Sequence, residues 1–334
     1  MIEPDLGGPV LVIGCGSIGK RHLRNLAGLH VAPLLVYDPD EARASRAAEE
    51  SGARALARLE EAPALAAAFI CSPTGLHLQA AWLALERGAH LFVEKPVSDT
   101  LDGVGAFLAE ARRRNRCVMV GFNLRFHPCL RTIKRLVDEG AIGRVLGARI
   151  QFGQYLPDWH AWEDYRRGYS ANRVLGGGIV LDAVHEFDYG RWLLGEVRAV
   201  SGMCATTGSL AVDTEDIAAF TLRHEQGGIS GIHLDYLQRT YARTCQLIGT
   251  DGTISWDWNA RAVRCYRSRT GIWEEFPEPV GYDENETYLD EIRAFAAAVA
   301  GKAPPPVDGE SGARVLAVAL AAKEAAASGR TVSL

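Results

Sequence analysis

The chain has 334 residues, of which 48% are hydrophobic and 23% are charged, and its formal net charge is −5. This length suits two medium-sized domains, and the acidic balance without a long basic stripe argues against nucleic-acid binding. No apolar run is long enough to span a bilayer, the N-terminal segment does not resemble a signal peptide, and the seven scattered cysteines do not suggest a disulfide framework, so we expect a cytoplasmic protein.

The first third of the chain alternates short apolar runs with alanine-rich helical stretches. Strands are predicted at Val10–Ile13, Leu34–Tyr37, Ala67–Cys71, His90–Val93 and Val118–Val120. Helices are predicted between them at Ile18–Leu29, Glu41–Ser51, Leu76–Arg87 and Leu101–Arg114. This alternation predicts an α/β Rossmann domain with a parallel sheet, which we place at residues 1–122.

After Gly121 the pattern changes, and residues 123–334 are predicted to form an α+β domain for substrate binding and oligomerisation, with a large, open, mostly antiparallel sheet. Its strands are expected at Val145–Phe152, Val197–Thr206, Ile217–Arg223, Gly228–Tyr236, Thr244–Gly249, Thr253–Trp258 and Ala262–Tyr266. Helices are expected at Pro128–Glu139, after Gly176-Gly177-Gly178, and at Asn285–Ala300 and Ser311–Ser328.

A glycine-rich turn follows the first strand and opens a helix, in the sequence Gly14-Cys15-Gly16-Ser17-Ile18-Gly19. Gly14 would make the tight turn, Gly16 would let the backbone approach a pyrophosphate, and Gly19 would permit close helix packing. The helix N-terminus then favours the anion. Asp38 ends the second strand, where a carboxylate binds ribose hydroxyls and repels a 2′-phosphate, so NAD is expected rather than NADP, although Arg43 could approach such a phosphate.

Two further motifs follow at strand ends: Cys71-Ser72-Pro73-Thr74 with His77, and Glu94-Lys95-Pro96. Together with the glycine turn, with Gly121-Phe122-Asn123 and Arg125, and with Gly249-Thr250-Asp251-Gly252, their order and spacing resemble the glucose–fructose oxidoreductase/inositol dehydrogenase (Gfo/Idh/MocA) family. The resemblance covers nearly the whole chain. It implies NAD(P)-dependent hydride transfer to or from a secondary hydroxyl of a sugar or sugar derivative.

The resemblance assigns roles to these motifs. Lys95 is implied to hydrogen-bond the reacting oxygen and the cofactor, which suits an ammonium beside a developing alkoxide. Glu94 would orient that lysine, and Pro96 is a candidate for a cis peptide. The cofactor contacts implied in addition are Ser17, Ile18, Ser72, Pro73, Thr74 and His77. For His77 the alternative is a locally hydrogen-bonded residue at a helix N-terminus.

The second part of the expected site follows the three glycines. On one helix Asp182, His185 and Asp188 would share a side. A histidine near neutral pH beside a carboxylate suits removal of the hydroxyl proton, so His185 is the expected base; the alternative is a structural histidine satisfied by Asp188. Asp182 is a catalytic and substrate-binding candidate, but it lies three residues before the histidine, where the family usually has four. Its role therefore stays open.

The segment from Gln154 to Arg167 is rich in aromatic and charged residues. Indole rings can stack on sugars and arginine can bind carboxylate or phosphate, so the segment either contacts substrate or forms a subunit contact or structural cap. The expected substrate-binding residues, including those implied by the resemblance, are Asn123, Arg125, Trp159, Trp162, Arg166 and Asp182. The segment is also similar to a branch of the family associated with surface-sugar and nonulosonate precursors.

Other predictions concern ligands and assembly. No cluster shows metal-ligand spacing, so no metal is expected. Relatives in such a family imply a homodimer or homotetramer. Two alternative functions remain: an NAD-dependent glycosidase that works through transient oxidation, and a non-catalytic NAD(H)-binding protein.

Overall fold

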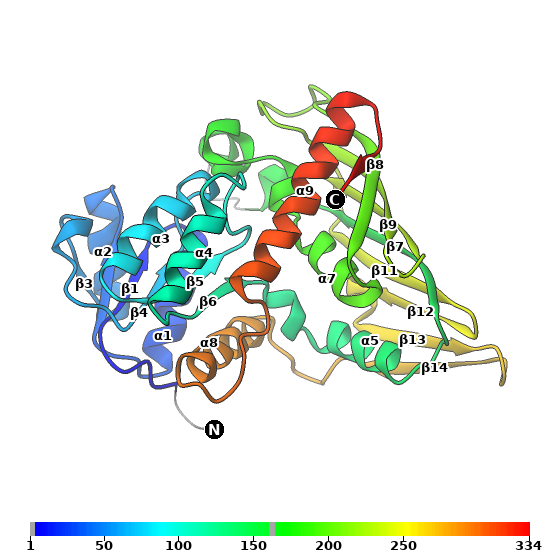
Figure 1. Ribbon diagram of the computed structural model, residues 1–334, viewed down its shortest axis with the longest axis horizontal. Coiled ribbons are helices and arrows are strands. Elements are labelled where there is room, and N and C mark those ends of the chain that lie inside the picture. Colours follow the sequence, from blue (N-terminus) through cyan, green and yellow to red (C-terminus); the bar gives the residue numbers. More distant parts are fainter. Residues whose placement is uncertain (1–3, 160–163) are drawn as a thin grey trace. The chain divides into compact units, whose positions relative to one another are not determined.

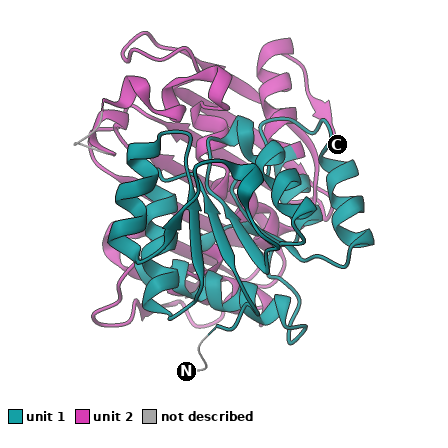
Figure 2. Ribbon diagram, turned by 90° about the vertical axis from the view of Figure 1, so that its left-hand side faces the viewer, with its two compact units in different colours: residues 1–123, 285–316 teal, residues 124–284, 317–334 magenta. Residues whose placement is uncertain are grey.

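A computed structural model describes residues 4–159 and 164–334. The chain forms two compact units (Figures 1 and 2). The first comprises the chain up to Asn123 together with Asn285–Leu316, and the second comprises Leu124–Glu284 with Ala317–Leu334. No helix among the described residues is long and apolar enough to cross a membrane.

The first unit contains a parallel sheet in the order β3-β2-β1-β4-β5-β6. Its strands are β1 (Val10–Ile13), β2 (Leu34–Tyr37), β3 (Arg54–Ala55), β4 (Ala67–Ile70), β5 (His90–Glu94) and β6 (Val118–Gly121). The helices that follow them are α1 (Ser17–Gly28), α2 (Glu41–Ser51), α3 (His77–Glu86) and α4 (Val104–Arg113), and they flank the strands in Figure 2. The central strands are wholly buried, as expected for a sheet covered on both faces.

Helix α8 (Asn285–Val299) belongs to this first unit as well. Its Phe295 ring packs edge-on against Phe69 of β4 and Phe92 of β5, at centroid distances of 5.6 and 5.8 Å. This differs from the sequence-based division, which assigned all residues after 122 to the second domain. A local pattern could not reveal it, because the aromatic contact joins segments about 200 residues apart.

The second unit contains a mostly antiparallel sheet in the order β14-β13-β12-β11-β7-β10-β9-β8-β15, in which β7 and β10 pair in parallel. Its strands are β7 (Val145–Gly153), β8 (Val197–Ala205), β9 (Ile217–His224), β10 (Ile229–Asp235), β11 (Ala242–Gly249), β12 (Gly252–Asp257), β13 (Ala262–Arg267), β14 (Ile272–Pro277) and β15 (Val332–Ser333). Burial alternates along β9, so one face of the sheet covers a core. Helices α5 (Pro128–Asp138), α6 (Ile179–Asp182) and α7 (His185–Leu194) pack on the sheet, and α9 (Gly309–Ser328) runs from the first unit into the second (Figure 1).

The fold class predicted from the sequence is confirmed. The structure adds β3, β14 and β15, which the sequence analysis did not identify. Strands β3 and β15 have two residues each, too few to show a period. Strand β14 is an exposed sheet edge, so it lacks the buried apolar side chains that mark a strand in a sequence.

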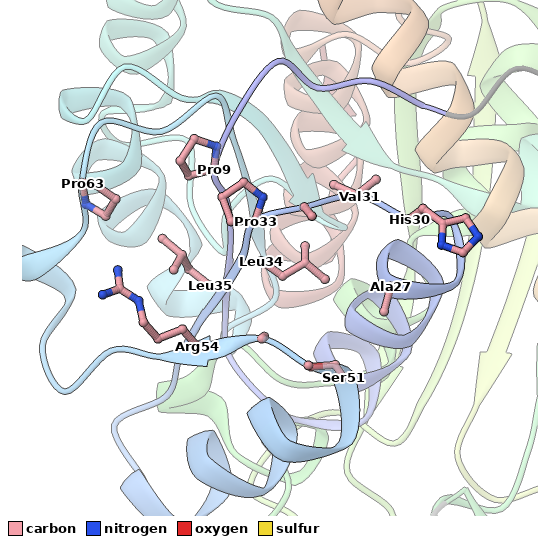
Figure 3. A pocket seen from close by; sticks show the side chains of 13 residues that line it. Pro9, Ala27, His30, Val31, Pro33, Leu34, Leu35, Ser51, Arg54 and Pro63 are labelled. Atoms are coloured by element: carbon pink, nitrogen blue, oxygen red, sulfur yellow. The ribbon is translucent and has the colours of Figure 1, made fainter.

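A hollow of ≈ 640 Å³ opens on the first unit (Figure 3). Pro9, Pro33 and Pro63 line it, and each of them precedes a strand. The hollow therefore lies at the amino ends of the parallel strands. Ligands of open α/β sheets bind at the carboxyl ends of the strands, so a cofactor is expected at the sheet edge opposite this hollow.

Candidate active site

At the carboxyl edge of the parallel sheet, the glycine turn fits closely against the neighbouring strand. Gly14 has a φ of +98°, and a Cβ there would lie 2.5 Å from the carbonyl oxygen of Cys71 at the end of β4. A Cβ on Gly19 would lie 1.9 Å from the Gly14 carbonyl oxygen. The space above Gly16, by contrast, is open to at least 4 Å. Tight packing behind the turn and open space over Gly16 are what a bound pyrophosphate requires.

Asp38 follows β2 at the same edge and is almost fully buried. Its carboxylate accepts hydrogen bonds from the backbone N–H groups of Cys15 and Asp40, at 2.8 and 2.9 Å. Arg43 forms an ion pair with it at 3.7 Å. The carboxylate is thus fixed beside the glycine turn, in the place where a ribose-binding acid is expected.

Strand β5 ends in Glu94, and Lys95 follows it immediately, with a cis peptide bond to Pro96 as the sequence suggested. Glu94 Oε1 lies 2.7 Å from the imidazole Nε2 of His22 in α1, and Oε2 accepts a hydrogen bond from the Lys95 backbone N–H at 3.3 Å. The Glu94 carboxylate therefore orders the backbone at Lys95 and contacts the helix that the glycine turn opens.

His77 begins α3 and is only 2% exposed. Its Nδ1 lies 2.8 Å from the Pro96 carbonyl oxygen, and its Nε2 lies 2.8 Å from the Ser72 carbonyl oxygen. Burial lowers the pKa of this imidazole below its ordinary value, and the neutral ring has one N–H, which donates to one of the two carbonyl oxygens. The contacts join the loop that contains Ser72, Pro73 and Thr74 to the loop after Lys95.

A second buried acid, Glu291 in α8, lies in the same unit. Burial first, and the charge of Glu94 second, raise its pKa well above the ordinary value of a glutamate. Neither of its carboxyl oxygens has a hydrogen-bond partner among the described groups. The sequence analysis missed this residue, because a lone glutamate in an alanine-rich helix carries no sign of its burial.

The cysteines in this region are buried thiols. Burial, assisted by the charge of Asp38, raises the pKa of Cys15 to about 12, and burial also raises the pKa of Cys71 well above its ordinary value. A thiolate would be needed for nucleophilic or metal-binding chemistry. These two residues therefore contribute packing rather than reactive groups.

In the second unit the expected catalytic helix is broken. Asp182 ends α6 and His185 begins α7, with Ala183 between them at ψ +33°. The prediction that Asp182, His185 and Asp188 share one side of a single helix is therefore wrong. His185 lies at the N-terminus of α7.

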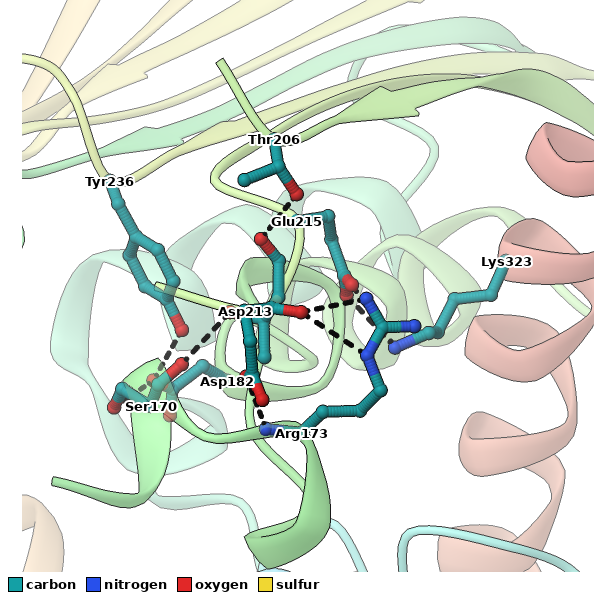
Figure 4. A network of polar contacts seen from close by, with 9 residues as sticks. Ser170, Arg173, Asp182, Thr206, Asp213, Glu215, Tyr236 and Lys323 are labelled. Carbon is teal, nitrogen blue, oxygen red and sulfur yellow. Dashed lines mark hydrogen bonds and ion pairs between the residues drawn. The ribbon is translucent and has the colours of Figure 1, made fainter. Parts of the chain in front are cut away.

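The Asp182 carboxylate accepts hydrogen bonds from hydroxyl groups (Figure 4). Tyr169 donates to Oδ1, while Ser170 and Tyr236 donate to Oδ2 at 2.6 and 2.7 Å. Asp182 is only 5% exposed. It joins the end of β10 to the short helical turns between residues 165 and 175.

Asp188 is committed to an arginine. Arg125 binds its carboxylate with both Nε and Nη2, at 2.8 and 2.7 Å, and the guanidinium stacks over the Trp192 ring. Both side chains are nearly buried. This pairing gives Arg125, expected to bind substrate, a structural partner within its own unit.

The remaining predicted substrate contacts are also held by neighbours. Asn123 donates to Thr287 Oγ1 at 3.0 Å, and Trp159 donates to the Gln154 carbonyl at 3.2 Å. Arg166 is exposed and forms a double hydrogen bond with Asp164. Trp162 lies outside the described residues. Their roles toward a substrate remain predictions.

One group of metal-ligand atom types occurs in the described part of the chain. His127, Cys129 and Glu278 bring such atoms within 4.8 Å of one another. The sequence could not show this, because Glu278 is remote from the other two. The His127 Nδ1 accepts from the Cys129 backbone N–H at 3.3 Å, which leaves a proton on the nitrogen that lies 3.4 Å from Glu278. Burial also raises the pKa of Cys129 to about 12, so hydrogen bonding accounts for the group without an ion.

Comparison with known proteins adds the family context. Residues 9–122 match the description "Oxidoreductase family, NAD-binding Rossmann fold", and residues 130–255 match "GFO/IDH/MocA C-terminal domain". The myo-inositol 2-dehydrogenase of Thermotoga maritima is 30% identical, over 97% of this chain and 97% of that protein. The UDP-N-acetylglucosamine 3-dehydrogenase of Acidithiobacillus ferrooxidans is 26% identical, over 92% and 94%. A solved levoglucosan dehydrogenase, in complex with NADH and levoglucosan, superposes with a TM-score of 0.86 at 23% identity, over 98% of this chain and 99% of that one.

Proposed function

The chain belongs to the Gfo/Idh/MocA family of NAD-binding oxidoreductases, and we propose that it transfers a hydride between NAD and a secondary hydroxyl of a cyclic polyol, sugar or sugar derivative. Membership of this family, with its similarity to sugar and polyol dehydrogenases, supports an NAD-dependent oxidoreductase of sugar-type substrates. The observation that best supports hydride transfer at a secondary hydroxyl is the position of Lys95. It directly follows β5, at the same sheet edge as the glycine turn and Asp38.

In this proposal NAD, when bound, supplies the hydride-accepting ring. The glycine turn and Asp38 would hold its pyrophosphate and ribose, since the open space at Gly16 and the fixed carboxylate suit those groups. Asp38 would make NAD the preferred form over NADP. The contacts of His77 with Ser72 and Pro96 would keep the two adjoining loops in place.

Two side chains of the chain then act on the substrate hydroxyl. The Lys95 ammonium would donate a hydrogen bond to the reacting oxygen and stabilise the charge that develops there. His185, the first residue of α7, would take the hydroxyl proton as general base. Oxidation releases one hydride to NAD and one proton to the histidine, and reduction reverses both.

The experiment is a substrate screen with the purified protein and NAD. NADH formation would be followed with myo-inositol, levoglucosan, UDP-N-acetylglucosamine and N-acetylneuraminic acid, which represent polyols, anhydrosugars, nucleotide sugars and nonulosonates. Accumulation of NADH with any of them supports a dehydrogenase. Release of a free sugar from a glycoside without NADH accumulation would instead indicate the glycosidase, and NAD binding without turnover on the whole panel would indicate a binding protein.

Assembly and location are further parts of the proposal. We propose a homodimer or homotetramer in which the face of the second sheet that does not serve the cofactor packs on another copy. A hollow of ≈ 550 Å³ on this sheet is lined by the polar side chains of Arg149, Gln151 and His233 together with apolar residues, a mixed surface of the kind that subunit contacts use. We also propose the cytoplasm, since all seven cysteines are free thiols. Light scattering tests the first statement, and cell fractionation the second.

A further inference from the structure

Asp182 lies three residues before the proposed base, yet its carboxylate points to a different set of groups. Tyr169 and Ser170 belong to one 3-10 turn, η6 (Tyr169–Ala171), and Tyr236 follows β10. All of them donate hydroxyl hydrogen bonds to Asp182. Both carboxylate oxygens are thus engaged by the segment before the three glycines and by the end of the sheet.

The same segment is fixed at several other points, and we name residues 164–175 the loop anchor. Ser170 accepts from Thr214 through its carbonyl at 3.2 Å. Arg173 donates from its guanidinium to the Asp213 carbonyl at 2.7 Å (Figure 4). A Cβ on Gly177 would lie 2.1 Å from the Tyr169 carbonyl oxygen, so the first turn of the glycine run packs directly under this loop. Asp182 is a buried charge at this anchor, and three hydroxyl groups donate to it.

A carboxylate that accepts hydrogen bonds from several buried hydroxyls is held in one orientation and contributes more to the local structure than a neutral group does. We propose that Asp182 is a positioning residue: it fixes residues 164–175 against β10 and thereby sets the affinity for the sugar-type substrate, and it does not act as the proton acceptor. The shortened spacing to His185 agrees with this, because the break between α6 and α7 separates the two residues. The substrate part of the inference rests on the proposed function.

The first test needs no substrate. Arg166, Arg167 and Arg173 are exposed within the loop and are trypsin sites. Asp182→Asn replaces one carboxylate oxygen with an amide NH2 group, which cannot accept a hydrogen bond from a hydroxyl. Loss of one charge-assisted hydrogen bond shifts the opening equilibrium of the loop by about tenfold. Tryptic cleavage at these arginines should therefore accelerate by about tenfold. The control Asp158→Asn, an exposed aspartate before the loop, should cleave at the wild-type rate. Equal cleavage of Asp182→Asn and wild type would overturn the inference.

Ser170→Ala and Tyr236→Phe each remove one donor and keep the carboxylate, so they should accelerate cleavage in the same direction by a smaller factor. They also decide the question if Asp182→Asn does not fold: wild-type cleavage rates in both variants would then overturn the inference, and faster cleavage in both would support it.

The second test uses NAD reduction with myo-inositol as the probe. Asp182→Asn should raise KM while kcat stays within about threefold and the pH dependence of kcat/KM keeps its acid limb, because the base is another residue. Loss of that acid limb with an unchanged KM would assign the proton transfer to Asp182 and overturn the inference. If the wild-type protein does not reduce NAD with any sugar or polyol, the proposed function is wrong. The tryptic cleavage rates still test the role of Asp182 in the loop anchor in that case.

Discussion

The imidazole Nε2 of His22 lies 2.7 Å from the carboxylate Oε1 of Glu94 and joins helix α1 to the end of strand β5 within the first unit. The His22 ring is fully buried against Phe69 and Phe92, and the Glu94 side chain is 9% exposed. One hydrogen bond therefore connects the helix of the glycine turn to strand β5, which Lys95 follows. Its contribution to the fold can be measured.

His22→Ala should destabilise the first unit. The substitution leaves the buried Glu94 carboxylate without its side-chain partner, which costs about 1–3 kcal/mol, and the cavity that opens beside two phenylalanines adds to the loss. Urea unfolding measures the loss. Arg24→Ala, an exposed change on the same helix, is the control and should stay within about 0.5 kcal/mol of wild type. A His22→Ala protein as stable as that control would contradict the expectation.

Glu291→Gln should stabilise the protein, and increasingly so as the pH rises. The folded-state pKa of Glu291 lies above its unfolded value because of burial and the charge of Glu94. Such a group gives its full stabilisation below the unfolded pKa and loses it as pH rises through the folded pKa, whereas glutamine stays neutral. Melting temperatures of both proteins from about pH 5 to about pH 9 test this. A difference in Tm that does not change with pH would refute it.

Most of the first unit could be predicted because its signals are local. Apolar runs of four or five residues, each followed by a helical stretch, predict strands that are connected through helices and therefore run parallel in one sheet. The glycine turn and Lys95 are adjacent to those strands, so their place at one sheet edge follows from the same pattern. The position of α8 does not, since Phe295 reaches its aromatic partners only through the fold.

The partners of the site residues were the part that the sequence could not provide. Glu94 was expected to orient the Lys95 side chain, whereas the structure gives it His22 and the Lys95 backbone. The spacing predicts Asp182 on one helix face with His185, but the helix is interrupted after Asp182, and Tyr169 and Tyr236 donate to the Asp182 carboxylate. Such contacts depend on distant segments and on backbone angles, which no spacing rule encodes.

Asp38→Ala should reduce the preference for NAD over NADP. The carboxylate is fixed by the Cys15 and Asp40 backbone N–H groups and would repel a 2′-phosphate. Its loss removes a charge-assisted contact to ribose, so NAD affinity should fall by about 10- to 100-fold, while Arg43 is released from its ion pair and can approach the phosphate. Calorimetric titration with both cofactors measures the change. Preferred NADP binding by the wild type would overturn the assignment.

Lys95→Ala and His185→Ala should each depress turnover strongly while NAD binding persists. Removing a preorganised donor to the reacting oxygen typically costs about 100- to 1000-fold, and removing a general base costs roughly 100- to 10,000-fold. The glycine turn and Asp38 are untouched in both variants, so cofactor titration should give wild-type affinity for His185→Ala and at most a modest loss for Lys95→Ala. The pH profile separates the roles: His185→Ala should lose the acid limb of kcat/KM, which titrates the base, because that limb reports a proton acceptor that the variant lacks. Near-wild-type turnover of His185→Ala on a substrate found by the screen would transfer the role of base to another group.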